Sequence, residues 1–303
     1  MVSVYADFSA AFPWFFPAAV FFLGACVGSF LNVVIYRVPK SQSVVTPGSH
    51  CGCGQPIRWH DNIPIVSWLV LRGRARCCGR KFSFRYPFVE LLTATLFTLC
   101  WLRFPPAVAA CGWLFLSCLT AATFIDLDHM IIPDVFTIGL GVAGVALSAV
   151  VPALHGFHGD VALLEGMRGG LVALQGLLIG SGVVLWIALI AESLLRKEAM
   201  GFGDVTFVGG IGAFCGWQGA LFTVFGGAVV GTLWLALAWL WEKGTGRRAA
   251  LAPPTETPEG QAAPLGFGAH VPFGPMLAIA AAIYFLALRE PVVAWFREFA
   301  EML

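Results

Sequence analysis

Charged residues are scarce in this chain of 303 residues: Asp, Glu, Lys and Arg together make up 12%, whereas apolar residues make up 58%. Soluble domains average about 25% charged and about 45–50% apolar residues. The scarcity of charge therefore excludes an ordinary soluble globular protein, and the abundance of apolar residues excludes a disordered chain. With a mean hydropathy of +0.82, the sequence predicts a protein that crosses a membrane several times.

Long stretches without charge predict the individual spans, because a transmembrane helix needs about 20 mostly apolar residues. The stretch 205–241 would extend about 55 Å as one helix, so we expect a turn at 215–219 to divide it into two spans. The other predicted spans lie at 8–36, 91–102 (extended toward Pro87), 104–125, 135–154, 169–191 and 271–288. The predicted fold class is an all-α polytopic membrane protein with about eight transmembrane helices.

The distribution of Lys and Arg predicts the orientation in the membrane, since basic residues concentrate on the cytoplasmic side. If the N-terminus lies outside, 14 of the 18 basic residues fall in cytoplasmic segments. Those segments are 37–86, 126–134, 192–204 and 242–270. Both termini are then expected outside the cytoplasm. The absence of Lys and Arg before Tyr36 argues against a cleaved signal peptide.

The cytoplasmic segments suggest a division of the chain. Residues 37–86 form a compact insert with nine basic residues and a single acid, Asp61, whereas residues 243–268 have the composition of a flexible linker. The expected parts are a first transmembrane helix (1–36), the insert (37–86), seven further helices including the linker (87–289) and a C-terminal tail (290–303).

Four of the nine cysteines lie in this insert as two close pairs, Cys51 with Cys53 and Cys77 with Cys78. The separation of the pairs and the glycines beside them suggest a tetrahedral thiolate site of the zinc-knuckle kind. Adjacent cysteines rarely place both sulfurs on one metal, so His50 is an alternative ligand. Free thiols are the competing interpretation, and a disulfide is less favoured on the reducing side of the membrane.

The basic residues of the insert have a simple explanation in the neighbouring membrane. Anionic lipid headgroups attract clusters of Lys and Arg close to a transmembrane helix. We therefore expect membrane lipid, and no nucleic acid, among the partners.

Two carboxylates at the ends of apolar helices indicate function, because charge at membrane depth is costly. Asp126 ends the third predicted span, and Asp204 opens the sixth behind Gly201 and Gly203. Counting crossings places both at the cytoplasmic face, and the glycines would allow a close backbone approach. Two facing carboxylates can share one proton, as in aspartyl proteases. On residue chemistry alone, a structural hydrogen bond or a proton pathway explains the pair equally well.

Asp128 and Asp134 lie in the same polar segment as Asp126. Solvation at the membrane interface, or a helix that starts at Pro133 and Asp134, explains them more simply than catalysis does. They are therefore expected to have at most a supporting role.

Six short motifs occur along the chain between about residue 24 and residue 288. They are GSFLNVVIYR at 28–37, DNIPIVSWL at 61–69, RYPFVE at 85–90, D-x-D with I-P-D within 126–134, G-x-G-D at 201–204 and P-F-G-P at 272–275. In kind and order they resemble the type IV prepilin peptidase family. The resemblance implies a membrane aspartyl protease of the Gly-x-Gly-Asp type in the bacterial inner membrane. It would cut the leader of type IV prepilins or type II secretion pseudopilins after a glycine, at a site facing the cytoplasm.

The same resemblance implies roles for individual residues. Members with the cysteine loop usually also N-methylate the new terminal residue with S-adenosylmethionine, so 37–86 would be the methyltransferase-associated domain and 87–289 the protease domain. The implied catalytic residues are Asp126 and Asp204, supported by Asp128, Asp134, Gly201 and Gly203. The implied zinc ligands are Cys51, Cys53, Cys77 and Cys78. The sequence has no Gly-rich Rossmann fingerprint to mark a nucleotide site.

The cysteine pairs depart from the family pattern, which usually has C-x-x-C twice. Ala75 stands where a cysteine is expected, and Cys78 directly follows Cys77. The first pair is also one residue short. The departure concerns the metal geometry and leaves proteolysis untouched.

Two other functions compete with this interpretation. A transporter or channel would use Asp126 and Asp204 in an ion path, but it leaves the Gly-x-Gly-Asp context and the paired cysteines unexplained. A membrane scaffold would use the cysteine loop to dock an assembly platform, without catalysis.

Overall fold

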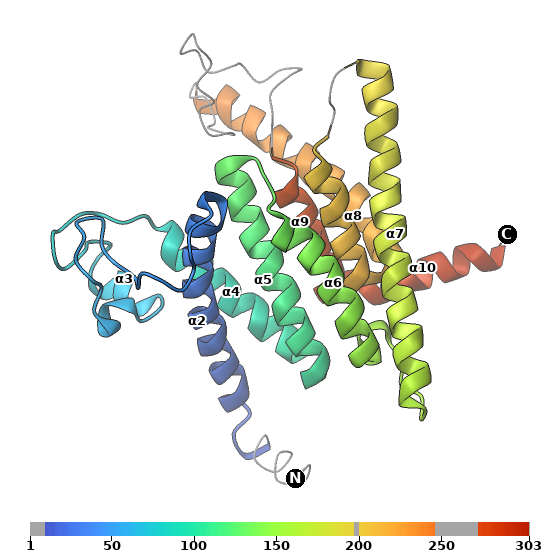
Figure 1. The fold of residues 1–303 in the computed structure, drawn as a ribbon, viewed down its shortest axis with the longest axis horizontal. Coiled ribbons are helices and arrows are strands. Elements are labelled where there is room, and N and C mark those ends of the chain that lie inside the picture. The colour runs from blue at the N-terminus through green and yellow to red at the C-terminus, as the bar shows by residue number, and fades with distance from the viewer. Residues whose placement is uncertain (1–9, 197–199, 246–271, 303) are drawn as a thin grey trace. The chain divides into compact units, whose positions relative to one another are not determined.

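The structure, a computed structural model, describes residues 10–196, 200–245 and 272–302. Across these residues it is helical, with two isolated β-bridges and no β-strand (Figure 1). The predicted all-α fold class is confirmed. The predicted linker at 243–268 falls outside the described residues from position 246 onward.

Nearly all of the described chain outside the cysteine loop lies in helices. The longer ones are α2 (Phe15–Arg37), α4 (Arg85–Arg103), α5 (Pro106–His129), α6 (Asp134–Val150), α7 (Ala162–Leu195), α8 (Phe202–Thr245), α9 (Gly274–Ile283) and α10 (Arg289–Met302). A π-helical turn, η4 (Tyr284–Leu288), joins α9 to α10. The shorter ones are η1 (Val38–Lys40), η2 (Trp59–Asn62), α3 (Val66–Val70) and η3 (Pro152–His155). Every predicted span overlaps one of the longer helices.

Five helical stretches are long and apolar enough to cross a membrane. They are Phe15–Lys40, Pro106–His129, Ala162–Leu195, Phe202–Thr245 and Gly274–Met302. The apolar helix α6 has 17 residues and is shorter than these. The structure thus supports a multi-pass membrane protein, and it does not confirm the predicted number of eight spans.

The helix α8 is interrupted at Gly216, where φ is 71° and ψ is 176°. A Cβ placed on Gly212 would lie 3.3 Å from the Cβ of Ala220, although eight residues of straight helix span about 12 Å. The chain therefore reverses at Gly216. Only glycine adopts this positive φ without strain, so Gly216 itself indicates the turn in the sequence. The prediction of a turn within 215–219 is confirmed.

The chain forms two compact units, Met1–Ala121 and Ala122–Leu303. In the first, α2 packs against α4 through glycines four residues apart. A Cβ on Gly24 would lie 2.7 Å from Cα of Ala94, and a Cβ on Gly28 would lie 2.7 Å from Cα of Glu90. Small residues at this spacing allow two helix backbones to touch within a membrane.

The second unit is held together in the same way. A Cβ on Gly176 of α7 would overlap the carbonyl oxygen of Gly212 of α8, and a Cβ on Gly144 of α6 would lie 2.6 Å from the Cβ of Ala213. The core between these helices includes the fully buried side chains of Leu140, Phe207, Ile211 and Phe214. This packing fixes the first half of α8, whose first turn contains Asp204.

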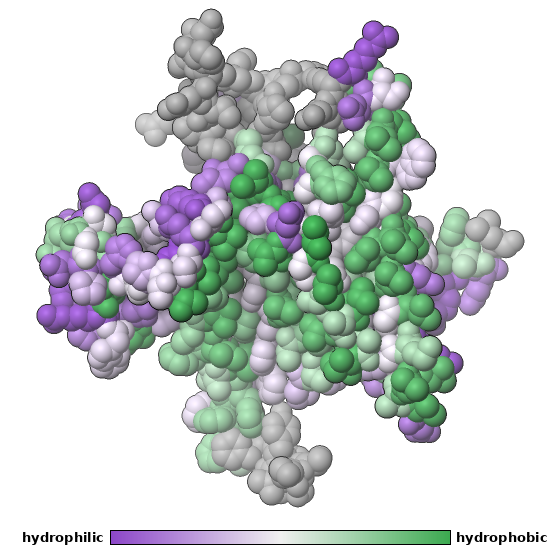
Figure 2. Space-filling view, viewed as in Figure 1, coloured by the Kyte–Doolittle hydropathy of each residue, from purple (hydrophilic) through white to green (hydrophobic). Residues whose placement is uncertain are grey.

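The outer surface of the helices is apolar, as a lipid environment requires. Large hydrophobic side chains such as Leu178, Trp186 and Phe225 are exposed. Figure 2 shows hydrophobic residues over the long helices and hydrophilic residues gathered over the loop between α2 and α4. The surface pattern therefore agrees with the charge distribution of the sequence.

Candidate functional sites

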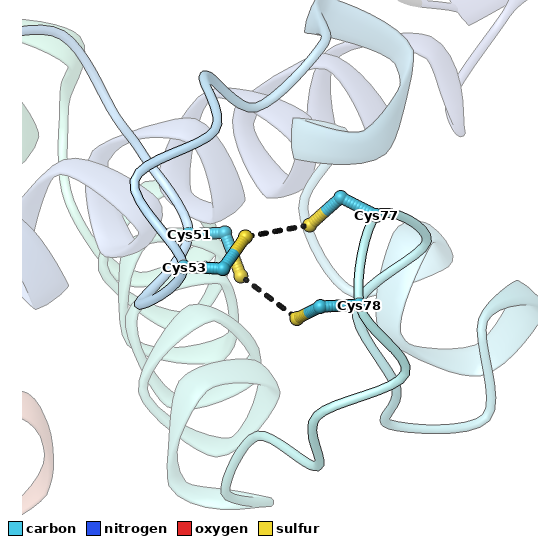
Figure 3. A group of neighbouring side chains, drawn as sticks. All are labelled: Cys51, Cys53, Cys77 and Cys78. Carbon is cyan, nitrogen blue, oxygen red and sulfur yellow. Dashed lines mark hydrogen bonds between the residues drawn. The ribbon is translucent and has the colours of Figure 1, made fainter.

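The four loop cysteines form one cluster (Figure 3). The Sγ atoms of Cys51 and Cys78 are 3.6 Å apart, and those of Cys53 and Cys77 are 3.4 Å apart. All four sulfurs lie within 4.8 Å of one another. A tetrahedral zinc site with Zn–S bonds of about 2.3 Å has sulfurs about 3.8 Å apart, so the spacing suits one ion.

Two similar turns present these sulfurs. The Gly54 amide donates to the Cys51 carbonyl at 2.8 Å, and the Gly79 amide donates to the Ala75 carbonyl at 2.8 Å. Both glycines have positive φ, 86° and 67°, a conformation that other residues rarely adopt. The glycines beside the cysteine pairs are therefore what allows each knuckle to close.

The structure brings together all four predicted ligands. Adjacent cysteines rarely place both sulfurs on one metal, but the sulfurs of Cys77 and Cys78 both point toward the first pair (Figure 3). The alternative ligand His50 lies outside the group, with its Nδ1 3.1 Å from the Gly48 carbonyl oxygen. The sulfur separations exceed a disulfide bond of about 2.05 Å, and all four cysteines are free. The donor set is thus four thiols.

The proximity of the thiols separates their acidities. The pKa of Cys51 is lowered to about 7, mainly because the Cys53 backbone amide donates to its sulfur and then because the Cys77 and Cys78 thiols do. The pKa of Cys77 is raised to about 12, mainly by its hydrogen bonds with the Cys53 and Cys51 side chains. One thiolate is therefore favoured within the cluster, and the thiolate is the form that binds metal.

An ion pair joins η2 to the second knuckle. Arg76 Nε lies 3.0 Å from both carboxylate oxygens of Asp61, and Arg76 Nη2 lies 2.9 Å from Asp61 Oδ1. The hydrogen bonds from this guanidinium hold the pKa of Asp61 below its usual value. The only acid of the basic insert is therefore used to hold Arg76 beside Cys77.

The second site is the aspartate pair, which lies within the second unit. Asp126 is 5% exposed, and Asp204 is half-buried in the first turn of α8. The two carboxylates lie close enough for their charges to interact. Asp126 Oδ2 also accepts a hydrogen bond from the Gly274 amide at 3.0 Å. Three segments that are distant in sequence therefore meet at Asp126.

The end of α5 explains how these segments meet. Met130 has a φ of 54°, and its amide donates to the Asp126 carbonyl at 2.9 Å, so the helix stops there. Ile132, two residues after Met130, lies beside both other segments. Its Cβ would lie 3.7 Å from a Cβ on Gly203, and its Cδ1 would lie 2.9 Å from a Cβ on Gly274. Ile132 thus packs between the start of α8 and the start of α9.

The supporting residues predicted from sequence have different environments. Asp128 and Asp134 are exposed. Asp134 begins α6 without a side-chain cap, and an acid in the first turn suits the helix dipole. Gly201 has open space around the position of a Cβ. The sequence interpretation did not select Gly274 and Ile132 individually, although the P-F-G-P and I-P-D motifs contain them.

Comparison with known proteins gives matches to both parts of the chain. The model of the bacterial peptidase A24 N-terminal domain matches residues 22–104, and that of the type IV leader peptidase family matches residues 113–236. A protein of Xanthomonas campestris called prepilin leader peptidase/N-methyltransferase is 34% identical over 299 residues, which are 89% of this chain and 90% of that protein. The chain belongs to the type IV leader peptidase family. The resemblance inferred from the motifs is confirmed.

Two further relatives are also called prepilin leader peptidase/N-methyltransferase. The one from Myxococcus xanthus is 40% identical over 233 residues, covering 73% of this chain and 63% of that protein. The one from Klebsiella pneumoniae is 35% identical over 225 residues, covering 72% of this chain and 92% of that protein. No solved structure matches the chain. The matched N-terminal domain contains the cysteine cluster, and the matched family region contains Asp126 and Asp204.

Proposed function

We propose that this protein is a prepilin leader peptidase that also N-methylates the terminus it creates. The observation that supports the peptidase half is that the segment following Asp126 lies beside the start of α8, which carries Asp204: Ile132 is next to Gly203. Its relatives are named for both activities. A transporter would also use membrane carboxylates, but nothing in the family comparisons favours one.

Paired carboxylates suit peptide hydrolysis because like charges at short distance cannot both ionise. The ionised carboxylate takes a proton from water as the water oxygen attacks the scissile carbonyl carbon. Its protonated partner donates to the carbonyl oxygen. The first carboxyl group then gives the proton taken from water to the leaving nitrogen as the C–N bond breaks, and the partner regains its proton as the new carboxyl carbonyl forms. In this proposal Asp126 and Asp204 are catalytic, and Asp128, Asp134, Gly201 and Gly203 have supporting roles.

The proposed substrates are type IV prepilins or type II secretion pseudopilins, cut after the glycine that precedes their hydrophobic helix. The proposed location is the bacterial inner membrane, with the aspartates facing the cytoplasm. Five candidate spans support the membrane location, and the collection of 14 of 18 basic residues in the predicted cytoplasmic segments supports this orientation. The basic loop would contact anionic lipid, and nucleic acid is not among the proposed partners.

The cysteine cluster is proposed to hold one zinc ion. Four thiols at these separations fit a structural site, and Cys51, Cys53, Cys77 and Cys78 would be the ligands. The loop has few buried side chains, so the metal would supply much of its folding free energy. S-adenosylmethionine would supply the methyl group. Residues 37–86 are then the methyltransferase-associated part and residues 87–289 the protease part.

The proposal is tested by incubating the purified protein with a prepilin in detergent or in vesicles. Mass spectrometry reports loss of the leader and, after S-adenosylmethionine is added, a gain of one methyl group on the new terminus. We expect both products. An intact prepilin after incubation with well-folded protein would refute the peptidase half, and an unmethylated mature pilin would refute the other half.

A further inference from the structure

Glu90 is a buried carboxylate that neither the aspartate pair nor the cysteine cluster uses. It lies in α4 and is 8% exposed. Its Oε2 accepts a hydrogen bond from the Ile65 amide at 2.6 Å, and the Ser29 hydroxyl of α2 also hydrogen-bonds its carboxyl group. A buried carboxylate needs such donors, because it is costly to remove from water without them. Glu90 thus joins three separate segments of the first unit.

The backbone that Glu90 holds is strained. Ile65 has φ 63° and ψ −52°, and the Val66 amide donates to the Pro64 carbonyl at 2.6 Å. These values define a γ-turn of the rare kind with positive φ. A β-branched residue is an outlier at such a φ. A turn of this kind persists only where its surroundings hold it, and the Glu90 carboxylate is bonded to the amide of its central residue.

Glu90 is itself placed rigidly by the packing of α2 on α4. A Cβ on Gly28 would lie 2.7 Å from Cα of Glu90, so the two backbones touch at this level. One turn further along α2, Asn32 Nδ2 donates to the Tyr86 carbonyl at 3.1 Å. The carboxylate is therefore a fixed point on the helices to which the loop can be attached.

The segment around Ile65 continues to the cysteine cluster. Asp61 pairs with Arg76, the neighbour of Cys77. Ser67 Oγ donates to the His60 carbonyl at 3.1 Å, which closes η2 and α3 into one piece. Glu90 thus holds, through Ile65, the piece of chain that in turn holds the second knuckle.

We propose that Glu90 is a positioning residue for the cysteine loop: its contact with Ile65 keeps the two knuckles together and supports methylation, while leader cleavage does not depend on it. The inference rests on the proposed function for its methylation part. It accounts for three motifs that the aspartates and the cysteines leave unexplained, because residues from 28–37, 61–69 and 85–90 meet at this carboxylate.

The test compares Glu90→Ala with Glu90→Gln, using the full-length protein. Three quantities are measured: alkylation of the loop thiols by a maleimide, retention of added zinc against a chelator, and both enzymatic products. In Glu90→Ala we expect thiol alkylation and zinc loss about tenfold faster and methylation about tenfold slower, with cleavage within about twofold of wild type. Glu90→Gln should stay within about twofold in all three, because its amide oxygen accepts the same hydrogen bond.

Two further variants distinguish a specific effect of the Glu90–Ile65 contact from general destabilisation of the protein. Glu165→Ala removes another buried carboxylate, one that pairs with Arg168 in the second unit, and should leave the loop thiols as protected as in wild type. Ile65→Gly relieves the strained turn because glycine accepts positive φ. Added to Glu90→Ala, it should restore part of the thiol protection.

Four results would overturn the proposal: wild-type protection in Glu90→Ala, equal loss in Glu90→Gln and Glu90→Ala, no restoration by Ile65→Gly, or loss of cleavage together with methylation in correctly inserted Glu90→Ala. Thiol alkylation needs neither prepilin nor methyl donor. It therefore decides the role of Glu90 even if the wild-type protein proves to have neither activity.

Discussion

The cysteine cluster and the aspartate pair are built in opposite ways. The cysteines lie within 27 positions of one another in a hydrophilic loop, and two glycine turns present them. The contact between Asp126 and Gly274 spans 148 positions and depends on how apolar helices pack. The first site should therefore respond to a bound metal ion and to local hydrogen bonds, and the second to the volume of side chains between helices.

The largest loss of leader cleavage is expected when either aspartate is replaced. Asp126→Asn and Asp204→Asn should each slow leader cleavage at least about 10³-fold, because asparagine keeps the shape but cannot exchange the proton. Both variants should still methylate a pre-cleaved pilin, since that activity does not need the carboxylate pair. The exposed Asp160 supplies a matched control, Asp160→Asn. Near-normal cleavage by either aspartate variant would contradict the peptidase assignment and favour the ion-path hypothesis.

The second-largest loss of cleavage is expected for Gly274→Ala. This variant tests the packing of the aspartate site without removing a carboxylate. The new Cβ would lie 2.7 Å from Asp126 Oδ2 and 2.9 Å from Ile132 Cδ1, so the carboxylate must shift. A shift near 1 Å costs about 10²-fold in rate, and we expect it in kcat with KM little changed. Gly182→Ala, where no atom lies within 4 Å of the new Cβ, is the control. Equal rates for the two variants would mean that Gly274 does not position Asp126.

Removal of the proposed zinc ion should affect the two activities differently. Cys53→Ser, or treatment with a strong chelator, should lower methylation about tenfold or more, because the loop loses the ion that would fold it. Cleavage should stay within about twofold. Cys26→Ala, in α2 and outside the cluster, is the comparison. Protein purified without metal, with four freely alkylated loop thiols, would contradict a zinc site.

The smallest effect is expected from the exposed ion pair of the loop. Asp61→Asn should speed alkylation of the loop thiols only about two- to threefold at pH 7 and low salt, because solvent and salt screen such pairs. The pKa of Asp61 is lowered in the folded loop, so its stabilisation is complete above the unfolded pKa of about 3.9. It is lost as the pH falls through the lowered folded value. A difference between Asp61→Asn and wild type that persisted below that range would show that the charge is not what matters.

Several local features could be predicted from the sequence because short-range physics determines them. Apolar runs predicted where the helices lie, and a polar, glycine-rich stretch predicted the reversal that occurs at Gly216. The paired cysteines predicted one cluster, since glycines at Gly54 and Gly79 allow each knuckle to close. Adjacent cysteines rarely place both sulfurs on one metal, but here the sulfurs of Cys77 and Cys78 both lie within 4.8 Å of those of the first pair.

The sequence by itself therefore determined the membrane class, the family and the cysteine cluster, and it indicated Asp126 and Asp204, because hydropathy, glycine conformation and motif order are properties of the sequence itself. Only the tertiary structure decided that Gly274 holds Asp126 and that Glu90 holds Ile65. Each of these contacts joins a carboxylate to a backbone amide in another segment. Every residue except proline offers such an amide, so no residue type marks the partner, and only the packing of the helices selects it.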